Sequence, residues 1–320
     1  MLREENGLIE VKNLSKNYGP VPAVKGISFT VEDGCIYGFL GPNGAGKSTT
    51  MNMLTGCLAP TQGEVKINGH DIIDEAIEAK KCIGYLPELP PLYLEMTPFE
   101  YLEFVGRARG LKKDALYDEM ERVMEKTKIT DVSDRLLRNL SKGYKQRVGI
   151  AQAIMGNPDI IILDEPTVGL DPIQIIEIRD LILELGEAHT VILSSHILQE
   201  IEAVCNRVIM ISQGKVVADD TLEALTKDET LEEAFVRLAG ESLDAGAAYA
   251  MAKAAEEDSD EEKPVSKKGK KKIIVESSLG AAYYDEIYVD EEPEAEEVED
   301  TDSDAEEEYS PMFTDKEDGE

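Results

Sequence analysis

Apolar and polar residues alternate in two segments near the start of the chain, LIEVKNLSKNYG and AVKGISFTVEDG, and each segment ends in a turn that contains glycine. A period of two residues predicts strands buried on one face, and the glycine turns favour an antiparallel arrangement. The segment GEVKINGHD predicts an edge hairpin in the same region. We therefore expect an antiparallel β subdomain in this part of the chain.

Buried strands and helices alternate over the part that follows. The short apolar runs CIYGFL, CIGYL, DIIILD and TVILSS predict buried strands, helices are expected over Pro172–Gly186 and Ile197–Cys205, and RVIMISQGKVVADD predicts a closing hairpin. From Thr97 to about Ile154 the pattern is helical throughout, so residues 87–155 are interpreted as a helical insertion. This order of elements predicts an α/β fold, with a core sheet flanked by helices, the antiparallel β subdomain and an inserted helical subdomain.

The character of the chain changes after Gly240. Residues 241–320 carry 28 acidic and 8 basic side chains, and Asp290–Glu308 is mostly Asp and Glu. A segment this polar buries too little apolar surface to offset the entropy cost of ordering its backbone. We expect a folded domain over residues 1–240 and an acidic tail over residues 241–320, disordered from about residue 245.

Charge and hydropathy limit the partners of the chain. The formal net charge is -33, which argues against nucleic acid as a partner, because affinity for phosphate backbones comes largely from Lys and Arg. A basic cluster, KKGKKK at Lys267–Lys272, has two interpretations: contact with anionic lipid, or a solvated counter-charge to its acidic neighbours. No apolar run approaches the ~20 residues of a membrane-spanning helix, and the N-terminus has no apolar signal region.

Cysteine and histidine residues are few and scattered. His70 and His189 are expected at the surface. The absence of a C-x-x-C pair favours reduced thiols in the core over a disulfide or a zinc site. The four cysteines are Cys35, Cys57, Cys82 and Cys205.

The segment GPNGAGKST lies between a predicted buried strand and a predicted helix, and it satisfies the phosphate-loop pattern G-x-x-x-x-G-K-[ST]. Its glycines let the backbone turn so that successive amide groups point at the β-phosphate of a nucleotide. Lys47 offers a mobile charge to the β- and γ-phosphates, and the Ser48 hydroxyl is a predicted ligand of Mg²⁺. The residues of this loop predicted to bind the nucleotide are Gly41, Pro42, Asn43, Gly44, Ala45, Gly46, Lys47, Ser48 and Thr49.

The segment IIILDEP supplies the complementary carboxylates. Its apolar residues predict a buried strand, and Asp164 at the carboxyl end of that strand is placed to reach Mg²⁺ through water. Glu165, the next residue, is placed to polarise an attacking water molecule. Together with the phosphate loop, these two carboxylates indicate a nucleoside triphosphatase.

Further motifs follow in a defined order. LSKGYKQR precedes the strand that carries Asp164, GLDP follows that strand at Gly169–Pro172, and SSH places His196 after one more strand. With these motifs, the chain resembles the nucleotide-binding subunit of an ATP-binding cassette (ABC) transporter over about residues 8–240. The resemblance implies a P-loop NTPase core of the RecA-like type, and it implies that Tyr18 stacks on adenine.

The chain departs from the family pattern in two places. The family signature is usually Leu-Ser-Gly-Gly-Gln. This chain keeps Ser141 and Gly143, but Lys142 replaces the first glycine and Tyr144 stands in place of the glutamine. Lys142 is either a solvated side chain or an added charge that steers phosphate. In IGYLPELPPLY, Glu88 stands where the family has a glutamine, and a carboxylate there is a further predicted Mg²⁺ ligand.

The resemblance also implies how such a subunit works. Lys47, Ser48 and Asp164 would hold ATP and Mg²⁺, while Glu165 orients water and His196 contacts the γ-phosphate. The signature residues Ser141, Lys142, Gly143 and Tyr144 would contact ATP on an opposing ATPase subunit, in a homodimer or a heterodimer. Asp171 would link the two sites.

Partners and location follow from the same resemblance. The motifs YLPE, LSKGYKQ and TLEEAFVRLAG resemble exporter-type cassettes of the antibiotic-resistance and sodium-extrusion group. The membrane-spanning permease subunits would be separate chains, and this chain would lie in the cytoplasm on the inner face of the cell membrane.

Two other functional classes are weighed against a transporter subunit. One is a soluble cassette protein that acts on an assembly such as the ribosome or on DNA; such relatives usually carry two cassettes, a coiled coil or a zinc insertion, and this chain has one phosphate loop and none of those insertions. The other is a nucleotide-dependent interaction protein whose acidic tail is the working part.

Overall fold

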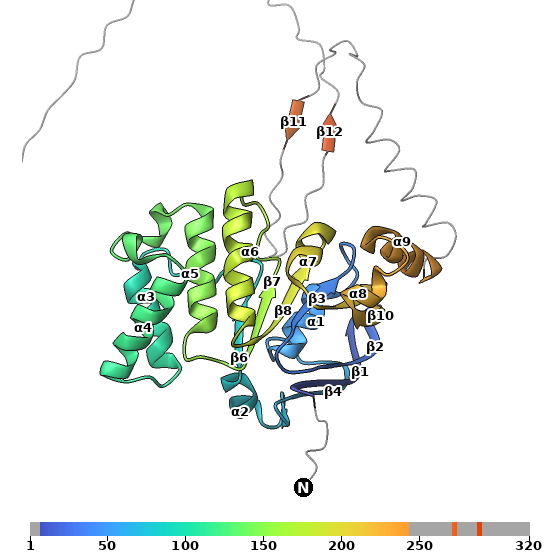
Figure 1. Cartoon of the computed structure of the whole chain (residues 1–320), viewed down its shortest axis with the longest axis horizontal. Helices are drawn as coiled ribbons and strands as arrows, with labels where there is room; N and C mark the ends of the chain where they lie inside the picture. The colour runs from blue at the N-terminus through green and yellow to red at the C-terminus, as the bar shows by residue number, and fades with distance from the viewer. Residues whose placement is uncertain (1–6, 243–270, 274–286, 290–320) are drawn as a thin grey trace, which may run out of the picture. The chain divides into compact units, whose positions relative to one another are not determined.

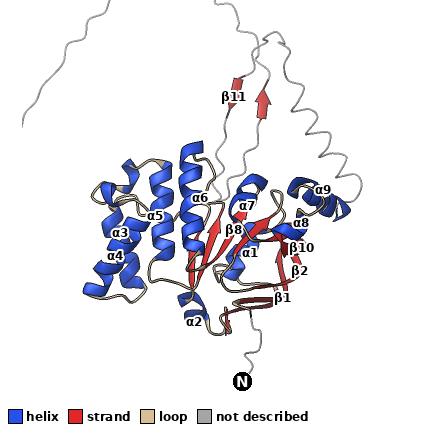
Figure 2. Cartoon of the chain, viewed as in Figure 1, coloured by secondary structure: helices blue, strands red, loops and turns tan. Residues whose placement is uncertain are grey.

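The computed structural model describes residues 7–242, 271–273 and 287–289 (Figure 1). The chain divides into two units, Met1–Glu256 and Glu257–Glu320. Helices and strands alternate in the first unit, so the predicted α/β fold class is confirmed (Figure 2).

A six-stranded sheet forms the centre of the first unit. Its strand order is β10-β9-β3-β8-β7-β6, and every neighbouring pair is parallel except β9 and β10, which form the predicted closing hairpin. The strands are β3 (Ile36–Leu40), β6 (Ile83–Leu86), β7 (Ile160–Asp164), β8 (Thr190–Ser195), β9 (Arg207–Ser212) and β10 (Lys215–Thr221).

A second sheet of four antiparallel strands forms the predicted β subdomain. Its order is β2-β1-β4-β5, so the short strand β5 lies at the edge, as the GEVKINGHD pattern predicts. The strands are β1 (Ile9–Tyr18), β2 (Val21–Val31), β4 (Gln62–Ile67) and β5 (His70–Asp71).

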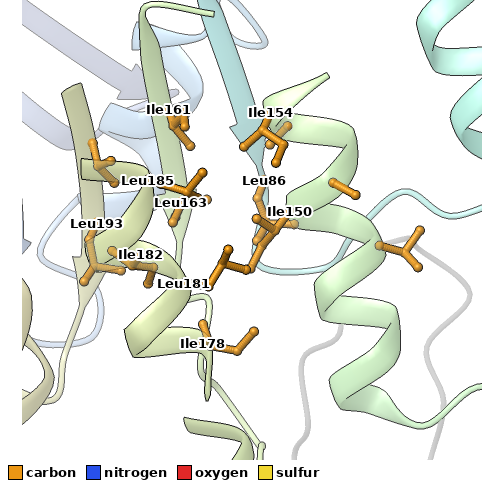
Figure 3. Packing of buried hydrophobic residues seen from close by; sticks show 14 of the residues in the cluster. Leu86, Ile150, Ile154, Ile161, Leu163, Ile178, Leu181, Ile182, Leu185 and Leu193 are labelled. Atoms are coloured by element: carbon orange, nitrogen blue, oxygen red, sulfur yellow. The ribbon is translucent and has the colours of Figure 1, made fainter. Parts of the chain in front are cut away.

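The parallel sheet is buried on both faces, which explains why its strands are apolar without alternation. In β7, Ile161 and Leu163 belong to the cluster formed with the helices, whereas Ile160 and Ile162 belong to the cluster formed with the antiparallel sheet. Figure 3 shows the helix side, where residues of α5 and α6 pack against β6, β7 and β8. Each face therefore supplies one hydrophobic layer.

The helices outside the insertion connect the strands. The predicted bounds of α6 are correct to the residue, and the helix predicted over Ile197–Cys205 is one residue shorter at each end, whereas α2, α8 and α9 were not predicted. These helices are α1 (Lys47–Leu54), α2 (Ala76–Lys81), α6 (Pro172–Gly186), α7 (Leu198–Val204), α8 (Leu222–Leu225) and α9 (Leu231–Ser242).

The first helix of the insertion begins where the helical pattern predicts, directly after Thr97. Residues 87–97 are not helical, because Pro87, Pro90 and Pro91 lack the amide hydrogen that a helix interior requires. Its first helix starts after Thr97, which caps it by accepting a hydrogen bond from the Glu100 amide. The elements are α3 (Pro98–Ala108), α4 (Asp114–Lys126), the short 3₁₀ helices η1 (Thr130–Val132) and η2 (Leu137–Asn139), and α5 (Lys142–Ile154).

Beyond α9, only six residues of the tail are described. β11 (Lys271–Ile273) and β12 (Ile287–Val289) pair as antiparallel strands, which the prediction of disorder did not anticipate. The rest of the predicted disordered segment lies outside the described residues. In the described ranges, no helix combines the length and the apolar character needed to cross a membrane.

Two expectations about scattered residues are wrong. His189 is buried, because its Nδ1 atom lies 2.8 Å from the carbonyl oxygen of Pro158 and this contact satisfies the ring inside the protein. Among the cysteines, Cys205 alone is buried in the core, whereas Cys57 is exposed and the other two are partly exposed.

Candidate active site

The phosphate loop connects the end of β3 to the start of α1. Gly44 and Gly46 both have positive φ, at 78° and 108°, a conformation that disfavours residues with a Cβ atom. At Gly41, a Cβ atom would lie 2.4 Å from the carbonyl oxygen of Ile211, so the loop is also packed closely against β9. The predicted turn is therefore present, with its backbone conformation set by glycine.

Lys47 is a buried cation at the first position of α1. Its side chain is 6% exposed, and its Nζ atom donates a hydrogen bond to the Gly41 carbonyl at 2.8 Å. The same atom lies 3.5 Å from Oε1 of Glu165. The ammonium group thus lies between the loop and the carboxylate at the end of β7, where a bound phosphate would meet it.

Asp164 ends β7 and is almost completely buried, with 2% of its surface exposed. Its Oδ1 atom accepts hydrogen bonds from the Ser48 hydroxyl at 3.4 Å and from the Ser194 hydroxyl. Burial raises the pKa of the Asp164 carboxyl, and the hydrogen bonds from Ser194 and Ser48 offset part of that rise. Ser48 and Asp164, both predicted metal ligands, are therefore brought together.

Glu165 has a strained backbone. Its φ is 48°, which is uncommon for a residue with a side chain and is a feature that clusters at functional sites. Its amide group donates to the hydroxyl and to the carbonyl of Ser194, at 3.1 and 3.2 Å. These bonds hold the turn by which the chain leaves the sheet at Glu165.

His196 is the partner of that carboxylate. Its Nδ1 atom lies 2.9 Å from Oε2 of Glu165, and its side chain is 41% exposed while that of Glu165 is 8% exposed. The imidazole therefore forms the accessible side of the pair. The structure brings together the two residues that the sequence predicts to be catalytic.

Lys47, Ser48, Glu165 and His196 line one cavity of about 320 Å³; Asp164 is not among the lining residues but accepts a hydrogen bond from Ser48. Glu88 also lines the cavity, so the carboxylate at the family's glutamine position faces the predicted nucleotide site. Tyr18 is not among the lining residues, and its side chain is 52% exposed at the end of β1. Residues of the phosphate loop that line the cavity are Pro42, Asn43, Gly44, Gly46, Lys47, Ser48 and Thr49.

The signature residues lie at a second cavity, of about 190 Å³, whose lining includes Ser141, Gly143 and Tyr144. Ser141 is the N-cap of α5, and its hydroxyl accepts a hydrogen bond from the Tyr144 amide at 3.3 Å. The Tyr144 hydroxyl donates to the Asp131 carboxylate at 2.8 Å. No residue lines both cavities, so the described chain keeps its signature apart from its own phosphate loop.

Lys142 and Asp171 belong to the surroundings of this second cavity. The Lys142 ammonium lies beside Gly169, where an added Cβ atom would be 2.2 Å from it. Asp171 caps α6, and its Oδ1 atom accepts hydrogen bonds from the amides of Ile173 and Gln174 at 3.0 Å. Gln174 in turn packs its carboxamide against Gly143. The signature helix and the loop before α6 are thus in direct contact.

Sequence reasoning missed two residues that hold the first cavity together. Ser194 hydrogen-bonds both Asp164 and Glu165, and Glu200 hydrogen-bonds Thr167 and Ser195. The SSH motif contains Ser194 and Ser195, but only its third residue, His196, is assigned a role from the sequence alone. The burial of Glu200 and its contacts come from the folded structure, so the sequence carries no signal for them.

Comparison with known proteins is consistent with this geometry. The model of a family described as ABC transporter matches residues 24–168. The chain is 39% identical to the ABC transporter ATP-binding protein NatA of Bacillus subtilis (67% of this chain, 87% of the relative) and 39% identical to the bacitracin transport ATP-binding protein BcrA of Bacillus licheniformis (69% and 72%). A solved structure described as a dimeric bacterial ABC transporter cassette superposes with a TM-score of 0.62 at 28% identity, covering 67% of this chain and 98% of that one.

The burial of Asp164 predicts that this residue lowers the stability of the nucleotide-free chain. Burial raises the pKa of the Asp164 carboxyl because it penalises the charged form, whereas Asp164→Asn keeps an acceptor for Ser194 without the charge. We expect Asp164→Asn to raise the thermal midpoint by a few degrees, at about 2–4 °C per kcal/mol for a domain of this size. The midpoint should no longer rise when ATP and Mg²⁺ are added.

Calorimetry with and without ATP and Mg²⁺ checks this prediction. Asp180→Asn is the matched control, because Asp180 is exposed on α6 and forms no hydrogen bond or ion pair within the described residues. A fall in the midpoint of nucleotide-free Asp164→Asn would contradict the expectation.

Proposed function

We propose, from the premise that this chain belongs to the family of ABC transporter ATP-binding proteins, that two subunits close head to tail around two ATP molecules. Membership of this family confirms the prediction that the chain is an ATP-hydrolysing subunit. Head-to-tail closure, the roles of individual residues, the metal and the membrane partners are the parts that we propose.

The observation that supports head-to-tail closure is the separation of the two cavities. The first is lined by the phosphate loop with Lys47 and by Glu165, and Asp164 is hydrogen-bonded to Ser48 on its wall, so these groups are sufficient to hold a triphosphate. The second presents the start of α5, where the first amide groups of the helix have no partner within the helix and attract anions. In a head-to-tail pair, the start of α5 in one subunit would meet the γ-phosphate held by the other.

The first cavity suggests a division of labour among its side chains. Lys47 would neutralise charge on the β- and γ-phosphates, and Glu165 would accept a hydrogen bond from the attacking water and orient it toward phosphorus. His196, held by Glu165 at 2.9 Å, would contact the γ-phosphate with its exposed edge. Tyr18 would meet adenine from the end of β1.

The residues at the end of β7 are suited to a magnesium ion. Ser48 and Asp164 place a hydroxyl and a carboxylate oxygen 3.4 Å apart, and hard oxygen ligands of this kind are those that Mg²⁺ prefers. Glu88 adds a second carboxylate on the cavity wall. When bound, Mg²⁺ supplies neutralising charge to the β- and γ-phosphate oxygens.

The opposing subunit would contribute its signature. Ser141 and Gly143 would contact the γ-phosphate through a hydroxyl and a backbone amide, with Lys142 and Tyr144 at the rim. Asp171 caps the helix whose Gln174 packs on Gly143, so a shift of the loop before α6 would be transmitted to the signature. This contact supports the proposal that Asp171 links the two sites.

The dimer would drive transport through separate membrane subunits, with export as the favoured direction. It would itself lie on the cytoplasmic face of the membrane. The exporter preference rests on the motifs YLPE, LSKGYKQ and TLEEAFVRLAG, which resemble those of exporter-type cassettes. The insertion that starts beside Glu88 would carry the motion, and Leu89, 81% exposed, lies at its entrance. The alternative is a soluble cassette ATPase acting on an assembly such as the ribosome.

We expect Glu165→Gln to bind ATP but to hydrolyse it very slowly, because an amide cannot orient water as the carboxylate does. The ATP-bound dimer should then persist, and gel filtration in ATP and Mg²⁺ should show it. Glu121→Gln, on the exposed face of α4, is the control. A Glu165→Gln protein that stays monomeric in ATP and retains full turnover would exclude this mechanism.

The transporter proposal predicts that a stoichiometric integral-membrane protein co-purifies with the chain from detergent-solubilised membranes. Leu89→Glu should reduce this capture while ATP binding is unchanged, because the side chain lies on the insertion surface. Ile77→Glu, at a position on α2 that is 73% exposed, is the matched control. Co-purification with ribosomes and with no membrane protein would favour the alternative.

A further inference from the structure

A second buried carboxylate, Glu200, lies behind the active site. It is on α7, one turn after His196, and 6% of its surface is exposed. None of the roles assigned above to the active site uses it. Buried carboxylates are rare without a specific partner or function.

One oxygen of Glu200 joins the two loops that carry the catalytic residues. Its Oε2 atom accepts a hydrogen bond from the Thr167 hydroxyl at 2.6 Å and another from the Ser195 hydroxyl at 3.0 Å. Thr167 is two residues after Glu165, and Ser195 is immediately before His196. The carboxylate therefore bridges the loop after β7 and the loop after β8.

The contact with Ser195 also determines the course of the chain around His196. The Ser195 hydroxyl donates its hydrogen to Glu200 and accepts one from the Ile197 amide at 3.0 Å. A hydroxyl has one hydrogen to give, so its direction is set by the carboxylate. The residues on both sides of His196 are thus held by a single side chain that Glu200 orients.

The other oxygen of Glu200 has no hydrogen-bond partner within the described residues. Leaving a buried acceptor unsatisfied costs about 1–3 kcal/mol, and more for a charged group. Glu200 shares a small cavity with Thr167, with Arg179 of α6 and with apolar side chains, and Arg179 is the only cation among the described residues that line it. Arg179 itself forms no ion pair within 4.0 Å in the described part of the chain.

We propose that Glu200 is a positioning residue for ATP hydrolysis, because it fixes the positions of Glu165 and His196 relative to each other. Arg179 supplies the counter-charge for the second oxygen of Glu200. The inference rests on the roles proposed for Glu165 and His196. It adds a connection from α6, which Asp171 caps, to the loop that carries His196. Glu200 acts through Thr167 and Ser195 and does not touch the substrate.

The test compares Glu200→Ala with Glu200→Gln in steady-state ATP hydrolysis and in ATP binding. Glu200→Ala removes the acceptor for both hydroxyls, so kcat should fall by about tenfold or more, since misplacing a catalytic group by about 1 Å costs up to ~10²-fold. ATP affinity should stay within about twofold, because Lys47 and the phosphate loop are untouched. Glu200→Gln keeps one acceptor oxygen and should restore most of kcat.

The counter-charge is tested by a double-mutant cycle. Arg179→Met should lower kcat in the wild-type background and have little further effect in Glu200→Gln, where the charge it balances is absent. Glu202→Ala is the matched control for Glu200→Ala, because Glu202 lies at an exposed position on the same helix, α7, and this variant should leave kcat unchanged. Equal losses from Arg179→Met in both backgrounds would overturn the role of Arg179.

Four other variants keep the result decisive. If Glu200→Ala does not fold, Thr167→Val and Ser195→Ala each remove one donor and should each lower kcat without weakening ATP binding. Wild-type turnover in Glu200→Ala, or in both donor variants, overturns the proposal. Glu165→Gln and His196→Ala are run beside them, and full turnover in those two would show instead that the proposed catalytic roles are wrong.

Discussion

The parallel register of three central strands is the constraint on which the rest of the structure depends. Leu40 of β3 pairs with Ser195 of β8, and Asp164 of β7 pairs with Ser194. Parallel strands end at the same edge of a sheet, and ligands of open α/β sheets bind beyond that edge. Segments far apart in the chain, the phosphate loop, the carboxylate pair and the SSH motif, therefore meet without any of them being close in sequence.

This convergence places charged groups where water has little access. Lys47, Asp164 and Glu165 are all less than a tenth exposed, and the effective cost of burying an ion in a protein is several kcal/mol. Hydrogen bonds from Ser48 and Ser194, and the contact between Lys47 and Glu165, reduce that cost without removing it. The apolar layers on both faces of the sheet supply the opposing free energy, which explains why strands that carry catalytic residues are otherwise so hydrophobic.

The elements that could be predicted are those with a strong local cause. A glycine loop between strand and helix leaves few alternatives, and Asp171 followed by Pro172 is a start signal that placed α6 correctly. Residues 87–97 contain three prolines, which keep the start of the insertion free of helix up to Thr97, where the predicted helical pattern begins. The positive φ of Glu165, the double role of Ser194 and the contacts of Glu200 depend on neighbours from other segments, so no local pattern reveals them. His189 was misplaced for the same reason, since its partner is a carbonyl from a distant turn.

The separation of phosphate loop and signature leads to the central claim, that each ATP is completed by a second subunit. The direct measurement mixes two inactive variants, Lys47→Ala and the signature variant Ser141→Arg, and records ATP hydrolysis. In a head-to-tail pair, the mixed dimer contains one site with an intact phosphate loop from one subunit and an intact signature from the other, so hydrolysis should reappear on mixing. If each site were built within a single chain, the mixture would stay as inactive as its components, and the claim would be contradicted.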